Sequence, residues 1–154
     1  MKKLFSDTIS FLLVLLFVYA ATSKLYDFKG FVNDMNNQPF PNSWTPFLTG
    51  SIPTVEILIA ACLLFPSTTI AGLYAALFLM LVFSTYTLLV LLNVFPYVPC
   101  SCGGIIKKLT WPQHFIFNVF FVLIAAAGIV IEKNKFTYFK NLFMHENRTN
   151  RKPV

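Results

Sequence analysis

The chain has 154 residues, of which 56% are hydrophobic and only 12% are charged. Soluble domains carry about 25% charged residues, so this chain could hardly cover a water-exposed surface and is expected to lie in a lipid bilayer. Its formal charge is +6, but no basic run is interleaved with aromatic residues on a polar segment, so nucleic acid is not an expected partner.

Four apolar stretches predict four transmembrane helices. They cover about residues 5–23, 52–66, 70–95 and 114–132, and the expected fold is all-α, a polytopic four-helix transmembrane bundle within residues 1–135. The first stretch also has the pattern of a cleaved signal peptide, and that alternative stays open. The second stretch is short for a crossing, which predicts local bilayer thinning or an extension into flanking residues.

A shorter pattern follows the first span. Phe28, Phe31, Val32 and Met35 recur at helical spacing, which predicts a short amphipathic helix lying on the membrane surface. Residues 36–46 are expected to form turns.

Two prolines follow the third span, and a basic segment with recurring phenylalanines follows the fourth. Pro96 and Pro99 are expected to end the third span, because proline cannot continue the hydrogen-bond ladder of a helix. Residues 136–154 are expected to form a basic cytoplasmic tail. Its phenylalanines at 136, 139 and 143 predict an interfacial helix, and the polar residues from about Glu146 are expected to be disordered.

The placement of lysine and arginine predicts the orientation. Four crossings put both termini on one side, which carries eight basic residues: Lys2, Lys3, Lys133, Lys135, Lys140, Arg148, Arg151 and Lys152. The other side carries four: Lys24, Lys29, Lys107 and Lys108. Because cytoplasmic loops are enriched in basic residues, both termini are expected in the cytoplasm. The loop between the third and fourth spans then faces outward, into an oxidising compartment.

Cys100 and Cys102 lie in that outward loop, separated by one residue. A disulfide between them would close a small ring, and strained, exposed disulfides are the more readily reduced ones. Two glycines follow directly and would let the backbone bend, and two nearby lysines would favour the reactive thiolate. The pair therefore predicts a thiol–disulfide role, with inert cysteines or a structural bridge as the simpler alternative.

A metal site is the competing use of the same residues. Cys100, Cys102 and His114 are soft or borderline ligands, but a closed site needs four, and His145 is expected on the opposite membrane face. No metal is therefore expected. By itself, His114 is typical of the start of a helix at the membrane interface.

Two residues within the second span are further candidates. Glu56 is expected near the outer end of that span, where a carboxylate is costly and often functional. An ion pair with Lys24, at the outer end of the first span, is the favoured interpretation, and proton or quinone chemistry is the alternative. Cys62 lies deeper and is expected to pack as a small hydrophobic side chain, with a redox role as the alternative.

Polar side chains gather on the third and fourth spans. Such residues usually join helices by hydrogen bonds, and a ligand cavity is the alternative interpretation. They are Ser84, Thr85, Tyr86, Thr87, Asn93 and Asn118.

Several segments resemble known membrane proteins over roughly residues 5–132. Lys24-Leu25-Tyr26-Asp27, and Ile52-Pro53 followed by Glu56, resemble the DoxX-like membrane proteins. The cysteine loop and the start of the fourth span resemble the MauE branch, which comprises methylamine utilisation proteins and their redox-associated relatives. The matching residues there are Cys100-Ser101-Cys102-Gly103-Gly104, Leu109-Thr110-Trp111-Pro112-Gln113-His114 and Asn118.

The resemblance implies a four-helix bundle in a bacterial inner membrane that forms, transports or maintains disulfides. Carried over residue by residue, a thiol–disulfide oxidoreductase activity falls on Cys100 and Cys102. Glu56, Lys24 and His114, singled out above from the residues themselves, are the expected supporting residues. The implied partners are the lipid bilayer and a periplasmic thioredoxin-like protein or disulfide-rich client. MauE proteins are linked to maturation of methylamine dehydrogenase, but the resemblance does not imply that this chain acts in methylamine metabolism.

Three functions are therefore open. In the first, a partner thiol attacks the Cys100–Cys102 bridge of an inner-membrane thiol–disulfide component, and the electrons leave to an acceptor. A membrane quinone would serve as that acceptor, although no residue pattern marks a site for it and no cofactor is evident. The second is a non-enzymatic scaffold or assembly factor for a periplasmic redox protein. The third is a small transporter, supported by the polar stripe of the third span.

Overall fold

The structure, a computed structural model, describes residues 2–95 and 110–149. Within these ranges the chain forms α-helices joined by short turns, and four of the helices are long and apolar enough to cross a membrane. The predicted all-α bundle with four spans is therefore confirmed. The elements are α1 Lys2–Tyr26, α2 Phe28–Asn36, the 3-10 turn η1 Asn42–Trp44, α3 Thr45–Leu64, α4 Thr69–Leu91 and α5 Trp111–Thr149.

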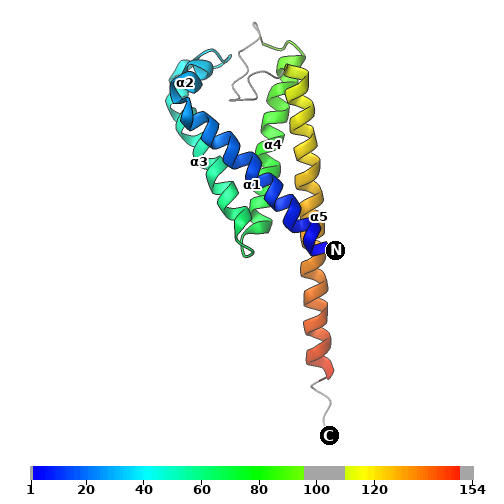
Figure 1. Cartoon of the computed structure of the whole chain (residues 1–154). Coiled ribbons are helices and arrows are strands. Elements are labelled where there is room, and N and C mark those ends of the chain that lie inside the picture. The colour runs from blue at the N-terminus through cyan, green and yellow to red at the C-terminus, as the bar shows by residue number, and fades with distance from the viewer. Residues whose placement is uncertain (1, 96–109, 150–154) are drawn as a thin grey trace.

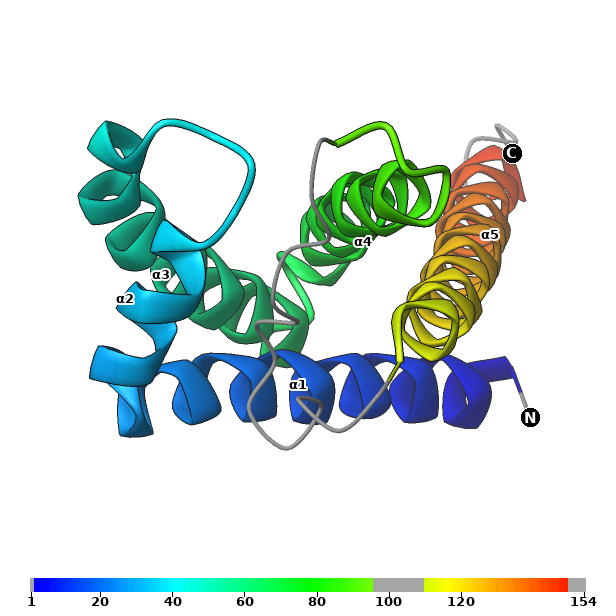
Figure 2. The same cartoon turned by 90° about the horizontal axis from the view of Figure 1, so that it is seen from above.

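The spans are arranged as two helix pairs. α1 packs along α3, and α4 packs along α5. The pairs meet where a short turn joins α3 to α4, and they diverge toward the end that carries α2 (Figure 1). Figure 2 shows α1 running across the bundle, while α4 and α5 are seen nearly end-on. The bundle is therefore closed at one end and splayed at the other.

The core lies toward the closed end. Gly128 of α5 allows a close approach there, because a Cβ atom at this position would lie 2.9 Å from Ile9 Cγ2 of α1 and 3.0 Å from Leu73 Cδ2 of α4. Large apolar side chains on the outer faces remain exposed, as expected for surfaces that meet lipid. The buried apolar cluster consists of Leu13, Phe17, Ile59, Ala60, Leu63, Leu73, Ala76, Met80, Phe121, Ala125 and Ile129.

The second span is longer than the apolar stretch that predicted it. α3 begins at Thr45 instead of near Ile52, so the span has 23 residues with η1 included. Pro46 occupies the first turn of α3, where its missing N–H costs nothing, and Pro53 is tolerated inside the helix. Of the two expectations for this short stretch, extension into the flanking residues is confirmed, and no bilayer thinning is needed.

The third span ends before its prolines. Asn93 has a positive φ of 54°, the left-handed conformation that asparagine tolerates. The Asn93 N–H donates to the Val90 carbonyl oxygen and the Val94 N–H donates to that of Leu89, which is the Schellman arrangement that closes a helix. α4 therefore ends at Leu91, and the expectation that Pro96 and Pro99 end it near residue 95 is wrong.

The fourth span begins and ends differently from the prediction. At its start, the Thr110 N–H donates to Gln113 Oε1 at 2.9 Å, half of a capping box that fixes the beginning of α5 at Trp111. At its far end the helix continues without a break through residues 132–135 to Thr149. The separate interfacial helix and the disorder expected from Glu146 are therefore replaced, up to Thr149, by one continuous helix.

The amphipathic helix after the first span is confirmed, but its location differs. Asp27 caps α2, because its side chain accepts a hydrogen bond from the Gly30 N–H at 3.0 Å. Phe31 and Met35 are buried in the protein, where α2 contacts α3 and α1. The apolar face of α2 therefore packs on the bundle and does not lie on lipid.

Candidate functional site

A cavity of about 340 Å³ lies where the two helix pairs diverge. Its walls come from the second half of α1, from α2 and the turn after it, from the first half of α3, the second half of α4 and the start of α5. Most of the wall is apolar, and seven aromatic rings contribute to it: Phe17, Phe31, Phe40, Phe83, Tyr86, Trp111 and Phe117.

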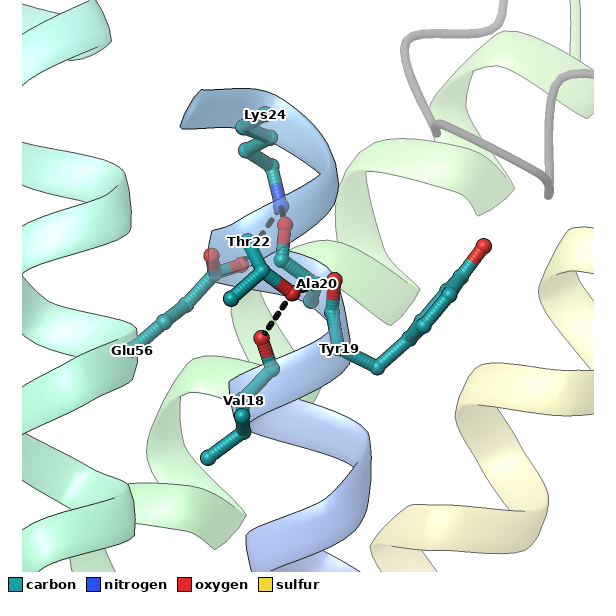
Figure 3. Close-up of polar contacts among 6 residues, drawn as sticks. All are labelled: Val18, Tyr19, Ala20, Thr22, Lys24 and Glu56. Atoms are coloured by element: carbon teal, nitrogen blue, oxygen red, sulfur yellow. Dashed lines mark hydrogen bonds and ion pairs between the residues drawn. The ribbon is translucent and has the colours of Figure 1, made fainter. Parts of the chain in front are cut away.

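Lys24 and Glu56 form an ion pair in the wall of this cavity. Lys24 Nζ lies 2.7 Å from Glu56 Oε1 and also donates to the Ala20 carbonyl oxygen at 3.2 Å (Figure 3). The predicted pairing of α1 with α3 through these residues is confirmed. The Glu56 side chain is 1% exposed and that of Lys24 is 13% exposed.

Glu56 lies deeper in its helix than the sequence suggested. Because α3 begins at Thr45, Glu56 is about three turns inside the helix, at 3.6 residues a turn. Its second oxygen, Oε2, is buried and has no hydrogen-bond partner among the residues that the structure describes. A buried acceptor without a donor costs free energy and calls for an explanation.

His114 reaches the same cavity from the first turn of α5. Its ring centroid lies 6.1 Å from that of Trp111, which in turn lies 6.4 Å from the Tyr86 ring of α4. The expected supporting residues Lys24, Glu56 and His114 therefore come from three helices and meet around one cavity.

Gln38 is a wall residue that the sequence did not single out. It is 4% exposed, its Nε2 donates to the Asp34 carbonyl oxygen at 3.0 Å, and its Oε1 accepts a hydrogen bond from the Tyr86 hydroxyl. This contact joins the turn after α2 to α4. The signal available was weak, since a single glutamine in a polar connection has no periodicity.

The polar side chains of the third and fourth spans differ in their contacts. Ser84, Thr85 and Thr87 donate to carbonyl oxygens of their own helix, so the expectation that they join helices is wrong for these three. Tyr86, Thr87 and Asn118 line the cavity. The expected joining by hydrogen bonds is confirmed for Tyr86, whose hydroxyl donates to Gln38, and the presence of a ligand in the cavity stays a prediction.

Of the three cysteines, the structure describes only Cys62. Cys100 and Cys102 lie outside the described residues, so their pairing and the metal set that includes them stay predictions. Cys62 is a free, half-buried thiol in the last turn of α3 and does not line the cavity. α3 ends at the closed end of the bundle, whereas α4 ends and α5 begins at the splayed end (Figure 1).

The fold and this site define a polytopic α-helical membrane protein, with four spans in the described part of the chain and a cavity between them. The chain belongs to the family described as methylamine utilisation protein MauE, whose family model matches residues 2–131. No curated protein and no solved structure matches the chain. The resemblance to MauE is therefore confirmed, and the resemblance to DoxX-like proteins stays a prediction.

Proposed function

We propose that this protein is a thiol–disulfide component of a bacterial inner membrane that supports disulfide formation in periplasmic proteins. The observation that carries the proposal is the pair Cys100 and Cys102, separated by one residue in the segment that joins α4 to α5. That segment begins and ends at the splayed end of the bundle, because Trp111 and Tyr86 both line the cavity there. The family match supports a role in methylamine utilisation, the activity that the family's description names.

The proposed reaction is a two-electron exchange. A thiolate of a reduced partner attacks one sulfur of the Cys100–Cys102 disulfide and forms a mixed disulfide, and the other sulfur leaves as a thiolate. The second partner thiolate then resolves the mixed disulfide, so the partner is oxidised and the cysteine pair is reduced to a dithiol. A quinone dissolved in the membrane would reoxidise the pair, taking two electrons and two protons to become a quinol.

The orientation follows from the basic residues. The eight-to-four excess on the side of the termini supports cytoplasmic termini and an outward cysteine loop. The partner is then a periplasmic thioredoxin-like protein or a disulfide-rich client. The family's description names methylamine utilisation, so enzymes of methylamine oxidation are one class of client to test.

The redox state of the two cysteines in living cells tests the proposal. Cells are quenched with acid and alkylated with a maleimide reagent that adds mass to each free thiol. Cys100 and Cys102 should be mostly protected as a disulfide, should become reactive when the acceptor is depleted, and should recover when it returns. A client that is oxidised equally well with the Cys100→Ser, Cys102→Ser double variant would support the scaffold function instead.

A further inference from the structure

We propose that the cavity between the two helix pairs binds the ring of a neutral membrane quinone, or of its quinol. The inference deepens the proposed function, since it assigns a site to the electron acceptor and rests on that function for its redox role. Binding itself does not require the cysteines, which lets the two proposals be tested apart.

The shape and lining of the cavity suit a flat ring. Its volume of about 340 Å³ is at the lower end of the 300–1,000 Å³ that is common for small-molecule sites. Phe83 and Tyr86 of α4 and Phe17 of α1 are among the aromatic residues that line the cavity. Aromatic rings prefer offset stacking or edge contacts with other rings, so the walls favour a planar ligand over a flexible chain.

One polar atom in the cavity wall suits a ligand that can donate a hydrogen bond. Glu56 Oε2 is buried with no partner among the described residues, and Glu56 itself is 1% exposed. A ligand hydroxyl would donate to this oxygen and remove the cost of leaving it unsatisfied. A quinol carries two such hydroxyls on opposite edges of its ring.

Lys24 provides the complementary group for the oxidised ligand. An ammonium has three donors, and two of those of Lys24 are used by the Ala20 carbonyl oxygen and Glu56 Oε1. The third donor can reach a carbonyl oxygen of a quinone. The ion pair therefore offers one donor and one acceptor side by side, matching the two redox forms of one ligand.

The charges in the wall argue against an anionic lipid. Lys24 is already paired with Glu56 at 2.7 Å, so a phosphate or carboxylate entering the cavity would meet the carboxylate of Glu56 beside a cation whose charge that carboxylate already offsets. Like charges at close range in a site of low dielectric repel strongly. A neutral head group avoids this cost, which is why a quinone is favoured over a phospholipid or a fatty acid.

The experiment measures quinone binding by tryptophan fluorescence. The chain has two tryptophans, and Trp44 is 60% exposed outside the cavity wall, so the Trp44→Phe variant leaves Trp111 as the reporter. Decylubiquinone and menadione are titrated into the purified full-length protein in detergent. Saturable quenching with at least one of them is expected, and the absence of saturable quenching with both would overturn the proposal.

Variants then locate the site. Ala20→Phe fills the cavity from α1, and we expect it to weaken binding by at least tenfold. Val18→Phe adds the same ring to the same helix at an exposed position outside the cavity wall and should leave binding unchanged. Glu56→Gln should weaken quinol binding about tenfold, the loss expected for a hydrogen bond to a charged group. Saturable binding that Ala20→Phe does not weaken would place the ligand elsewhere and overturn the assignment.

Two further measurements separate the alternatives. Palmitate and phosphatidylglycerol are added as competitors, and displacement of the quinone by either at equal concentration would favour a lipid site instead. The Cys100→Ser, Cys102→Ser double variant should bind quinone as the parent does. If binding holds while the cysteines show no exchange in cells, the proposed function fails and the quinone site stands.

Discussion

Lys24 Nζ and Glu56 Oε1 lie 2.7 Å apart and connect α1 to α3 in the wall of the cavity. Both groups are largely removed from solvent, Glu56 almost completely. In such a site the pair is held together by attraction in a medium of low dielectric, and each charge depends on the other to offset its desolvation.

Removing either member of this pair should destabilise the protein. We expect Glu56→Gln and Lys24→Met each to lower the free energy of unfolding by about 3 kcal/mol, because each leaves one buried charge without its partner. The double variant should cost less than the sum of the two. Thermal unfolding in detergent, followed by circular dichroism, measures all three, and strict additivity would mean that the contact contributes no coupling.

The orientation gives a second prediction. A reporter that is active only in the cytoplasm should work when fused after Val154, and one that is active only in the periplasm should work when inserted at Gly104. The reason is the eight-to-four bias of basic residues toward the side of the termini. The reverse pattern of activities would move the cysteine loop to the cytoplasm and remove its oxidising surroundings.

The cysteine pair gives a third prediction. Cys100→Ser or Cys102→Ser leaves one sulfur that can form a mixed disulfide and has no neighbour to release it, so a partner should stay attached. One of the two variants should trap more, since one sulfur receives the partner and the other resolves it. Non-reducing gels of cells that contain all clients measure the adducts.

The matched controls for this trapping are within the same chain. Cys62→Ser should behave like the parent, because Cys62 is in the last turn of α3, and α3 ends at the other end of the bundle from the helix ends that flank the pair. The double variant should trap nothing. If neither single variant forms a reducible adduct, thiol exchange is the wrong mechanism for this protein.

A fourth prediction concerns the contact between α1 and α5 near the closed end. Ser6 Oγ donates to Glu132 Oε2 at 2.6 Å, and Ser6 is 3% exposed. Ser6→Ala should lower the free energy of unfolding by about 1.5 kcal/mol, the lower part of the range for hydrogen bonds to charged groups. Thr8→Ala is the control, because the Thr8 hydroxyl donates to Leu4 within its own helix. Equal losses in the two variants would show that the α1–α5 bond contributes nothing specific.

The close approach at Gly128 gives a fifth prediction. A Cβ atom there would already lie 2.9 Å from Ile9 and 3.0 Å from Leu73, so Gly128→Leu should force α5 away from both helices. Overpacking of this kind costs about 1 to 3 kcal/mol. Ala127→Leu adds the same side chain on the exposed face of α5 and should be close to neutral. The difference between their unfolding temperatures measures the effect of the contact.

The amino-acid sequence was enough to predict which parts of this chain are helical and apolar. Hydropathy and helical spacing are local properties, so the four spans and the helix around Phe31 and Met35 could be predicted from them. The pairing of Lys24 with Glu56 was also predictable, because a carboxylate and a lysine within a membrane have few other partners.

The directions in which the faces of those helices point depend on how the helices pack against one another. Neither Gln38 nor His114 carries a signal that places it in a cavity, because their position there depends on how far the two helix pairs diverge. The burial of α2 was likewise undecided, since an amphipathic face fits lipid or protein equally well. The end of α4 depended on the left-handed conformation of Asn93, which backbone hydrogen bonds set and hydropathy does not register.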